Sequence, residues 1–309
     1  MKNKVMKKIN LTIVLLLFTV LGVQAQQEPN FTQYLYNMNI INPAYAGTKD
    51  ATSLGFQGRS QWLAVDGAPQ TQTLSIHAPV NDYVGVGFSV IHDALGPISQ
   101  TDVNGDFSYK LEIDRFTNLA LGMKVGASFM SVDGLEFIEA GDPLDESMQI
   151  TLLNVGIGAF YYSDRFYLGI SSPNMLESKY IKGTAGVYST AKDKMHVYLA
   201  GGYVFDLNYR KGWMIKPAFM LRAVQGAPLS FDVSTHIWYN EKLGAGIGYR
   251  YEDSVDLSFS FRTDSNFTIG YAYDYTLSRL GEFDSGSHEL FLQYDFDIRS
   301  RLIPDPRFF

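Results

Sequence analysis

The sequence of 309 residues contains no cysteine. The fold therefore has no disulfide bonds, and its stability must come from packing and from a complete set of backbone hydrogen bonds. A lipid anchor attached to an N-terminal cysteine is excluded for the same reason. The absence of cysteine fits an exported protein, although it does not establish export on its own.

Positive charge is also scarce. The chain has 25 Lys and Arg residues against 32 Asp and Glu residues, which gives a net charge of −7. Four of the basic residues and none of the acidic ones lie in residues 1–25, so the chain from residue 26 onward carries −11. Proteins that bind nucleic acid present a basic face. We therefore expect no nucleic-acid partner.

Long apolar runs are absent after residue 25, where none approaches the roughly 20 residues that a helix needs to cross a bilayer. Residues 1–25 combine four lysines with the apolar stretch Ile9–Val20 and the small-residue sequence Val23-Gln24-Ala25. This order is typical of a secretory signal peptide, so we expect cleavage near Ala25 and a mature chain that begins near Gln26. A retained N-terminal anchor is the alternative, but the apolar stretch is short for a membrane span.

Groups suited to catalysis or metal binding are sparse. Ser234-Thr235-His236 offers a serine and a histidine, but two polar side chains on the inward face of a strand explain this sequence better. The acidic residues between Glu136 and Glu146 lack the regular spacing of a calcium loop, and we interpret them as a solvated loop. We expect no enzyme activity, no metal site and no cofactor. The five histidines are scattered without metal-ligand spacing: His77, His92, His196, His236 and His288.

What the sequence has in abundance is period-two alternation, in which apolar and aromatic residues interleave with glycine, small and charged ones. This period is that of β-strands. Many of the runs exceed the usual strand length of about five or six residues and approach that of a tilted membrane-spanning strand. Fourteen runs can be counted, at residues 51–59, 69–79, 83–92, 100–112, 117–132, 148–162, 166–172, 194–207, 213–223, 229–239, 242–252, 255–263, 267–277 and 287–297.

The predicted connections between these runs fall into two alternating classes. The even-numbered connections are all short, whereas the odd-numbered ones include the longer segments 93–99, 133–147, 173–193 and 278–286. Short turns at one rim and longer loops at the other are typical of outer-membrane barrels, and an even strand number suits a closed one. The sequence therefore predicts an all-β transmembrane barrel of about 14 antiparallel strands. If its N-terminus is periplasmic, the long loops point out of the cell.

Each predicted strand has one face for lipid and one for the lumen. In residues 255–263, we expect Leu257 and Phe259 to point outward and Ser258 and Ser260 inward, so that the inward face tolerates arginine better. Tryptophans and many tyrosines near strand ends fit aromatic girdles at the membrane surfaces. Inward charges can either line a water-filled path or pair with one another, and these are Lys124, Asp232, Arg250, Asp256, Arg262 and Asp274.

The stretch from Phe31 to Gly47 precedes the first predicted strand and is too aromatic for a flexible linker. Because Pro43 crowds a helical residue before it, Asn42 is expected to be extended or in a turn. Gly47 can supply a positive φ or a close backbone approach. On composition alone, the stretch is equally well explained as an element packed on the core.

Several motifs in this chain together resemble the PorP/SprF family of Bacteroidetes outer-membrane proteins. The first is Gln33-Tyr34-x-x-Asn37 followed by Asn42-Pro43-Ala44-Tyr45-Ala46-Gly47. The others are Gln57-Gly58-Arg59-Ser60-Gln61-Trp62, Ala68-Pro69-x-Thr71 and Lys216-Pro217-Ala218-Phe219-Met220-Leu221-Arg222. The resemblance implies an outer-membrane barrel of the type IX secretion system and, in some members, of the gliding machinery. Its implied partners are other secretion components, a periplasmic peptidoglycan-binding lipoprotein and a secreted surface adhesin.

These observations predict four parts: a signal peptide at 1–25, an N-terminal plug or docking segment at 26–50, the barrel at 51–297 and a tail at 298–309. The function expected is that of a non-catalytic secretion component in the outer membrane, and a porin or hydrophobic-solute transporter is the alternative. We expect the N-terminal segment to lie at or in the periplasmic mouth and to bind the periplasmic partner. Its candidate partner-binding residues are Gln33, Tyr34, Asn37, Asn42, Pro43, Tyr45 and Gly47.

Overall fold

The structure is a computed structural model that describes residues 32, 34–49, 51–132, 148–176, 179–184, 187–192, 194–208 and 212–296. The predicted signal peptide, the acidic loop from Glu136 to Glu146, and the tail at 298–309 lie outside these residues. Among the described residues, no helix is long and apolar enough to cross a membrane.

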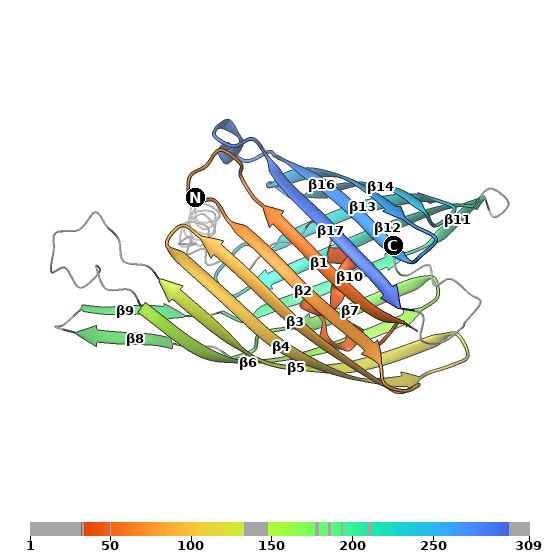
Figure 1. The fold of residues 1–309 in the computed structure, drawn as a ribbon, viewed down its shortest axis with the longest axis horizontal. Helices are drawn as coiled ribbons and strands as arrows, with labels where there is room; N and C mark the ends of the chain where they lie inside the picture. Colours follow the sequence, from red (N-terminus) through yellow and green to blue (C-terminus); the bar gives the residue numbers. More distant parts are fainter. Residues whose placement is uncertain are drawn as a thin grey trace, which may run out of the picture.

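The described chain forms a closed antiparallel barrel (Figure 1). From β1 to β7 and from β11 to β17 each strand pairs with the next along the chain, and β7 pairs with β10. Because β1 pairs with β17 and β10 pairs with β12, the sheet is closed into a ring. The strands are β1 Thr52–Ser60, β2 Gln70–Pro79, β3 Val84–Leu95, β4 Ile98–Glu112, β5 Thr117–Val132, β6 Met148–Ser163, β7 Phe166–Ser172, β10 His196–Tyr203, β11 Phe205–Asn208, β12 Trp213–Val224, β13 Ser230–Tyr239, β14 Leu243–Arg250, β15 Ser254–Arg262, β16 Phe267–Thr276 and β17 Ser287–Phe296.

The prediction of fourteen barrel strands is confirmed, because β10 and β11 both pair with β12 and together make one strand interrupted at Val204. The sequence analysis missed a separate hairpin, β8 (Lys179–Thr184) with β9 (Val187–Lys192). It lies within the predicted loop 173–193 and projects beyond one end of the barrel (Figure 1). Its two strands are only six residues each, which is short for a period-two signal.

The two ends of the barrel differ as predicted. We call the end that holds Thr52 and Phe296 the short-turn rim, since the connections there are brief, such as 164–165 and 240–242. The opposite end, the long-loop rim, holds the connections 133–147 and 277–286. One prediction at this rim was wrong: residues 93–99 form no long loop. Strands β3 and β4 continue to a two-residue turn, in which Gly96 supplies a φ of +54°.

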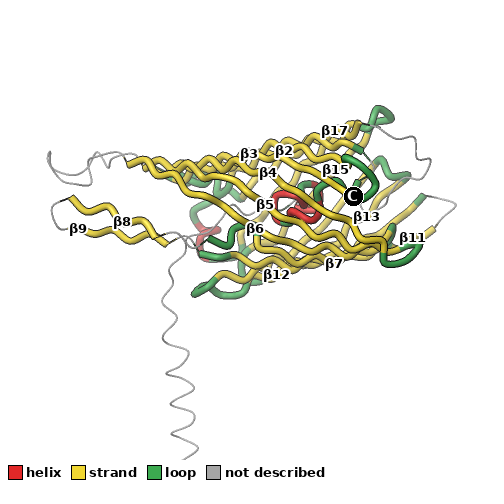
Figure 2. Tube along the Cα trace, turned by 90° about the horizontal axis from the view of Figure 1, so that it is seen from below, coloured by secondary structure: helices red, strands yellow, loops and turns green. Residues whose placement is uncertain are grey.

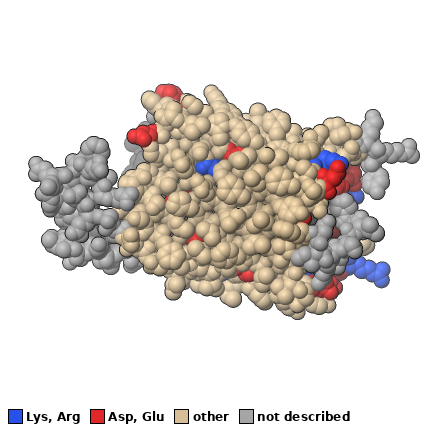
Figure 3. Space-filling model, in the orientation of Figure 1, with Lys and Arg blue, Asp and Glu red and all other residues tan. Residues whose placement is uncertain are grey.

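Side chains alternate between the two faces of the barrel wall. On β15, Leu257 and Phe259 are exposed on the outer surface and Ser258 is buried inside, as the alternation predicted. Figure 3 shows one face of the molecule, where few charged side chains interrupt the uncharged outer surface. This is the surface expected of a protein whose outer face meets lipid.

Candidate functional site

The lumen of the barrel is occupied by the chain's own N-terminal segment, residues 34–49, which we call the lumenal segment. It consists of three short helical turns: η1 (Tyr34–Tyr36), α2 (Met38–Ile41) and η2 (Pro43–Tyr45). Figure 2 shows helical turns inside the barrel wall. Aromatic rings of this stretch are buried against later parts of the chain, and Tyr34 and Tyr45 are each 5% exposed.

The turns of the lumenal segment are fixed by Asn42, Pro43 and Gly47. Asn42 is extended, with φ of −135° and ψ of 106°, as the following proline requires. Its side-chain oxygen accepts a hydrogen bond from Ala44 N at 3.0 Å and so caps η2. Gly47 has a φ of +68°, and a Cβ there would lie 2.4 Å from Gly85 Cα. Gly47 therefore provides both the positive φ and the close approach that the sequence allowed.

Glycines of the wall form notches for the segment. A Cβ on Gly122 of β5 would lie 2.2 Å from Ala44 N, and one on Gly158 of β6 would lie 2.1 Å from Asn42 Oδ1. A Cβ on Gly85 of β3 would meet Ala46 O at 2.2 Å. Contacts this short exclude any side chain, so the segment and the wall fit only because these wall positions are glycine.

Side chains of the wall also satisfy backbone groups of the segment. Such short helical turns leave carbonyl groups without helical partners, and a buried unpaired carbonyl is costly. Ser171 Oγ donates to Ile41 O at 2.7 Å, and Ser108 Oγ donates to Ala46 O at 2.5 Å. Lys124 Nζ donates to Asn39 O at 3.3 Å. Three strands therefore hold the segment by its main chain.

One side of the lumen is apolar. There Tyr34, Leu35, Met38 and Ile41 pack in a single cluster with side chains from the wall. The Tyr45 ring lies edge-on to that of Phe160, with centroids 5.3 Å apart. The wall residues of this cluster are Ala120, Phe160, Tyr162, Tyr167, Tyr198, Ala200, Ala218 and Met220.

The other side of the lumen is polar and charged. Arg59 of β1 contacts Asp274 of β16 through Nη2 at 2.6 Å and Glu289 of β17 through Nη1 at 2.9 Å. Its side chain is 2% exposed, and those of its partners are 3% and 0% exposed. Arg59 Nη1 also donates to Thr32 Oγ1 at 2.7 Å. This arginine therefore joins three strands and the start of the described chain.

Most of the predicted inward charges form ion pairs, although within the predicted set only Arg250 and Asp232 pair with each other. Lys124 forms an ion pair with Asp106 at 2.6 Å, and Arg250 forms one with Asp232 at 3.1 Å. Near the short-turn rim, Asp295 contacts both Lys49 and Arg262 at 3.4 Å. The sequence left open whether the inward charges line a water-filled path or form pairs, and ion pairing describes these residues.

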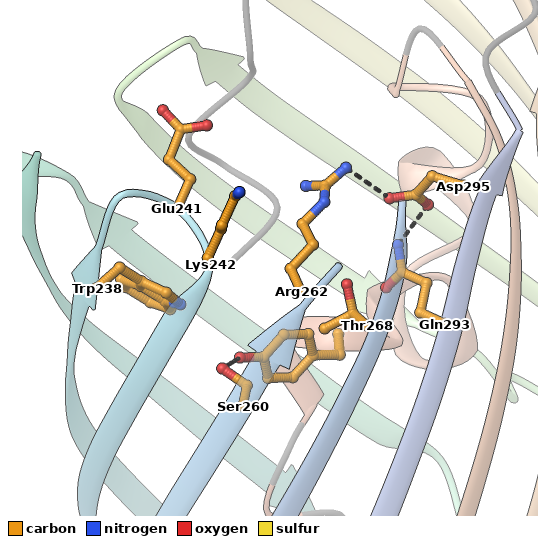
Figure 4. Close-up of a pocket in the computed structure, with 9 residues that line it drawn as sticks. Trp238, Glu241, Lys242, Ser260, Arg262, Thr268, Gln293 and Asp295 are labelled. Carbon is orange, nitrogen blue, oxygen red and sulfur yellow. Dashed lines mark hydrogen bonds and ion pairs between the residues drawn. The ribbon is translucent and has the colours of Figure 1, made fainter. Parts of the chain in front are cut away.

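At the short-turn rim, a recess is lined by Tyr36, by residues of β13, β15, β16 and β17, and by the turn between β13 and β14 (Figure 4). Arg262 points toward Asp295, and Tyr36 donates its hydroxyl to Ser260 Oγ at 3.0 Å. The recess has a volume of about 10 Å³, room for about one water molecule. It is too small for a solute.

The structure brings the predicted partner-binding residues together inside the lumen. Tyr34, Asn37, Asn42, Pro43 and Tyr45 are buried there and Gly47 is half-buried, while Gln33 lies outside the described residues. The segment passes through the lumen from Tyr34, beside Asp232 and Arg250, to Lys49 at the short-turn rim, and so extends well beyond the mouth.

The side chain of Asn37 bonds side chains of the wall. Its amide nitrogen donates to Gln57 at 3.3 Å, and its oxygen accepts from Ser75 at 2.8 Å. The sequence analysis did not single out Glu289 or Asp106. The sequence signal that could have identified them is the alternation along each strand, in which polar residues at every second position face inward.

Comparison with known proteins gives one family. The model of a family described as "Type IX secretion system membrane protein PorP/SprF" matches residues 23–294. Among curated proteins, none matches this sequence.

Solved structures share the barrel fold at low sequence identity. The Ralstonia pickettii toluene transporter TbuX is 10% identical with a TM-score of 0.51, over 82% of this chain and 92% of that one. A Pseudomonas aeruginosa FadL homologue is 12% identical with a TM-score of 0.49, over 87% of this chain and 95% of that one. Identities this low concern the fold alone.

Proposed function

The chain belongs to the PorP/SprF family of type IX secretion system membrane proteins, and from that premise we propose that it is a non-catalytic secretion component with a closed lumen. In this role the barrel stays in the outer membrane and supports secretion or surface anchoring of a cognate adhesin. It also contacts a periplasmic partner linked to peptidoglycan, and other components of the secretion machinery. Gliding motility is the process that such an adhesin serves.

The observation that carries this proposal is the fit between the lumenal segment and the wall. The segment is held by glycine notches, by hydrogen bonds to its main chain and by an apolar cluster. Each large apolar side chain buried in that cluster contributes about 1.5–3 kcal/mol. A segment held in this way closes the lumen as an integral part of the folded barrel. A closed lumen suits a docking component better than a pore.

The alternative is a porin or a transporter of hydrophobic solutes. Its support is that TbuX, which shares the barrel fold, is a toluene transporter by description. Transport through this barrel requires the lumenal segment to leave its position, because the segment occupies the lumen and contacts the wall closely, as between Ser171 Oγ and Ile41 O at 2.7 Å. The two functions therefore differ in what displacing the segment does.

We propose that the lumenal segment contributes to partner binding indirectly, by supporting the surface that the partner contacts. Tyr34, Asn37 and Tyr45 are buried, so in this proposal they act by holding the lumenal segment in the barrel and not by direct contact with the partner. Gln33, Asn42, Pro43 and Gly47 belong to the same segment and share this role in the proposal. The residues at the rim end of the segment are tied to the wall through Lys49 and Asp295.

The test is the Gly122→Ala variant, which adds one methyl group where only the segment is in the way. The atoms nearest to this Cβ are Ala44 N, Pro43 C and Ala44 Cα, all within 2.5 Å. Overpacking costs about 1–3 kcal/mol, which shifts the docked state of the segment by about 5- to 150-fold. The matched control is Gly105→Ala on β4, whose Cβ would meet Val125 O at an ordinary 3.8 Å.

We expect Gly122→Ala to remain inserted and heat-modifiable on a gel, yet to lose secretion of its client and co-purification with a periplasmic component. Gly105→Ala should behave as the wild type in both measurements. If Gly122→Ala keeps secretion and instead makes cells permeable to small solutes, the secretion role is wrong and the plugged-pore alternative replaces it.

A further inference from the structure

The lumenal segment has a direction, and its two ends lie at opposite rims. Lys49 pairs with Asp295, which is one residue from the end of β17 at the short-turn rim. Thr32, at the other end, contacts Arg59 and Asp274. Arg59 is one residue from the end of β1, and Asp274 is two residues from the end of β16, both at the long-loop rim. The chain therefore runs from the long-loop rim toward the short-turn rim before β1 begins.

Thr32 is fixed at the long-loop rim by a clasp of three residues: Arg59, Asp274 and Glu289. Its backbone N–H donates to Glu289 Oε2 at 2.9 Å, and its hydroxyl donates to Asp274 Oδ2 at 2.6 Å. The same hydroxyl accepts from Arg59 Nη1 at 2.7 Å. Hydrogen bonds in which one partner is charged are stronger than those between neutral groups. The position of Thr32 is therefore specified by three such bonds.

The residues ahead of Thr32 are too few to return to the short-turn rim. The mature chain is expected to begin near Gln26, and six residues span at most about 20–22 Å when fully extended. The distance from Arg59 back to Thr52 along β1 is seven residues, or about 23 Å at the rise of a strand. That path is also filled by the segment itself.

We propose that the lumenal segment is threaded so that the amino terminus of the mature chain faces the long-loop rim, the extracellular side of the barrel. The first residues of the mature protein then belong to the cell-surface face, although the first strand starts at the periplasmic rim. The segment thereby places its two ends in different compartments. This inference rests on the clasp and on the rule that the short turns of outer-membrane barrels are periplasmic and the longer loops extracellular. It replaces the condition of a periplasmic N-terminus from which the sequence oriented the barrel, and it is independent of the secretion role.

Cysteine labelling on intact cells tests the threading, since the chain has no cysteine of its own. The probe variant is Glu28→Cys, treated with a membrane-impermeant maleimide and read on the mature band. Ala227→Cys, exposed in the 225–229 connection, is the control for the long-loop rim. Arg115→Cys, exposed in the 113–116 turn, is the control for the short-turn rim.

We expect Glu28→Cys and Ala227→Cys to be labelled on intact cells, and Arg115→Cys only after the outer membrane is opened. Labelling of Glu28→Cys only after opening would place the amino terminus in the periplasm and overturn the proposal. Labelling only after unfolding would also overturn it, because the end would then stay within the lumen. An epitope inserted between Gln27 and Glu28 gives a second measurement, and antibody binding to intact cells is the expected result.

Discussion

Replacing Arg59 with glutamine should lower the free energy of unfolding by about 3–5 kcal/mol, the usual cost of breaking a buried ion pair. Arg59 is the cation that contacts both Asp274 and Glu289, and all three side chains are almost fully buried. Its loss leaves two carboxylates in the lumen without that partner. The measurement is urea-induced unfolding of the barrel in detergent micelles, followed by loss of heat-modifiability.

The chain contains a matched control for this variant. Arg165 contacts Asp206 with the same geometry, Nη2 to Oδ2 at 2.6 Å, but their side chains are 54% and 27% exposed. Exposed pairs contribute about 0–1 kcal/mol because water screens and solvates both partners. Arg165→Gln should therefore cost at most about 1 kcal/mol. Equal losses for the two variants would mean that burial does not set the energy of the Arg59 cluster.

Arginine in place of Leu257 is the second large perturbation. Leu257 lies near the middle of β15 on the outer surface, where its side chain is exposed in the isolated chain and therefore faces lipid. Arginine on the lipid face near the midplane costs about 2–4 kcal/mol, and about 0–1 kcal/mol near the membrane surfaces. We expect this variant to unfold at lower urea concentration in lipid vesicles.

Tyr251→Arg is the control for Leu257→Arg, because Tyr251 is exposed in the turn between β14 and β15 and lies beyond the strands. Its unfolding midpoint should stay close to that of the wild type. A loss at Tyr251 as large as that at Leu257 would show that depth in the membrane is not what makes arginine costly.

Arginine on the inward face illustrates where sequence analysis was insufficient. The alternation correctly placed Ser258 and Ser260 inside, and the sequence alone suggested that this face tolerates arginine better. In the structure, Ser260 Oγ accepts a hydrogen bond from Tyr36 at 3.0 Å. Period two identifies the face of a residue, but it does not indicate what fills the space opposite.

The strands and the backbone of the lumenal segment were the most predictable features. Pro43 restricts the conformation of the residue before it, and a glycine permits a positive φ at its own position. Both effects are local, which is why the conformations of Asn42 and Gly47 followed from the sequence. The partners of the buried charges were not predictable in this way. Arg59 and Asp274 are 215 residues apart, and their meeting depends on strand order, closure and register together.

The position of the lumenal segment has a consequence for the order of folding. Several of its contacts join residues very distant in sequence, such as Asn42 and Ala159, which are 117 residues apart, and Tyr36 and Ser260, which are 224 residues apart. Non-local contacts of this kind slow folding, because loop entropy is lost before they form. Once β1 pairs with β17, the segment is enclosed by hydrogen-bonded strands on every side. The segment therefore takes its place either before the β1–β17 pairing completes the ring or afterwards through an end of the barrel, and only in the first case does it act as an internal template for the wall.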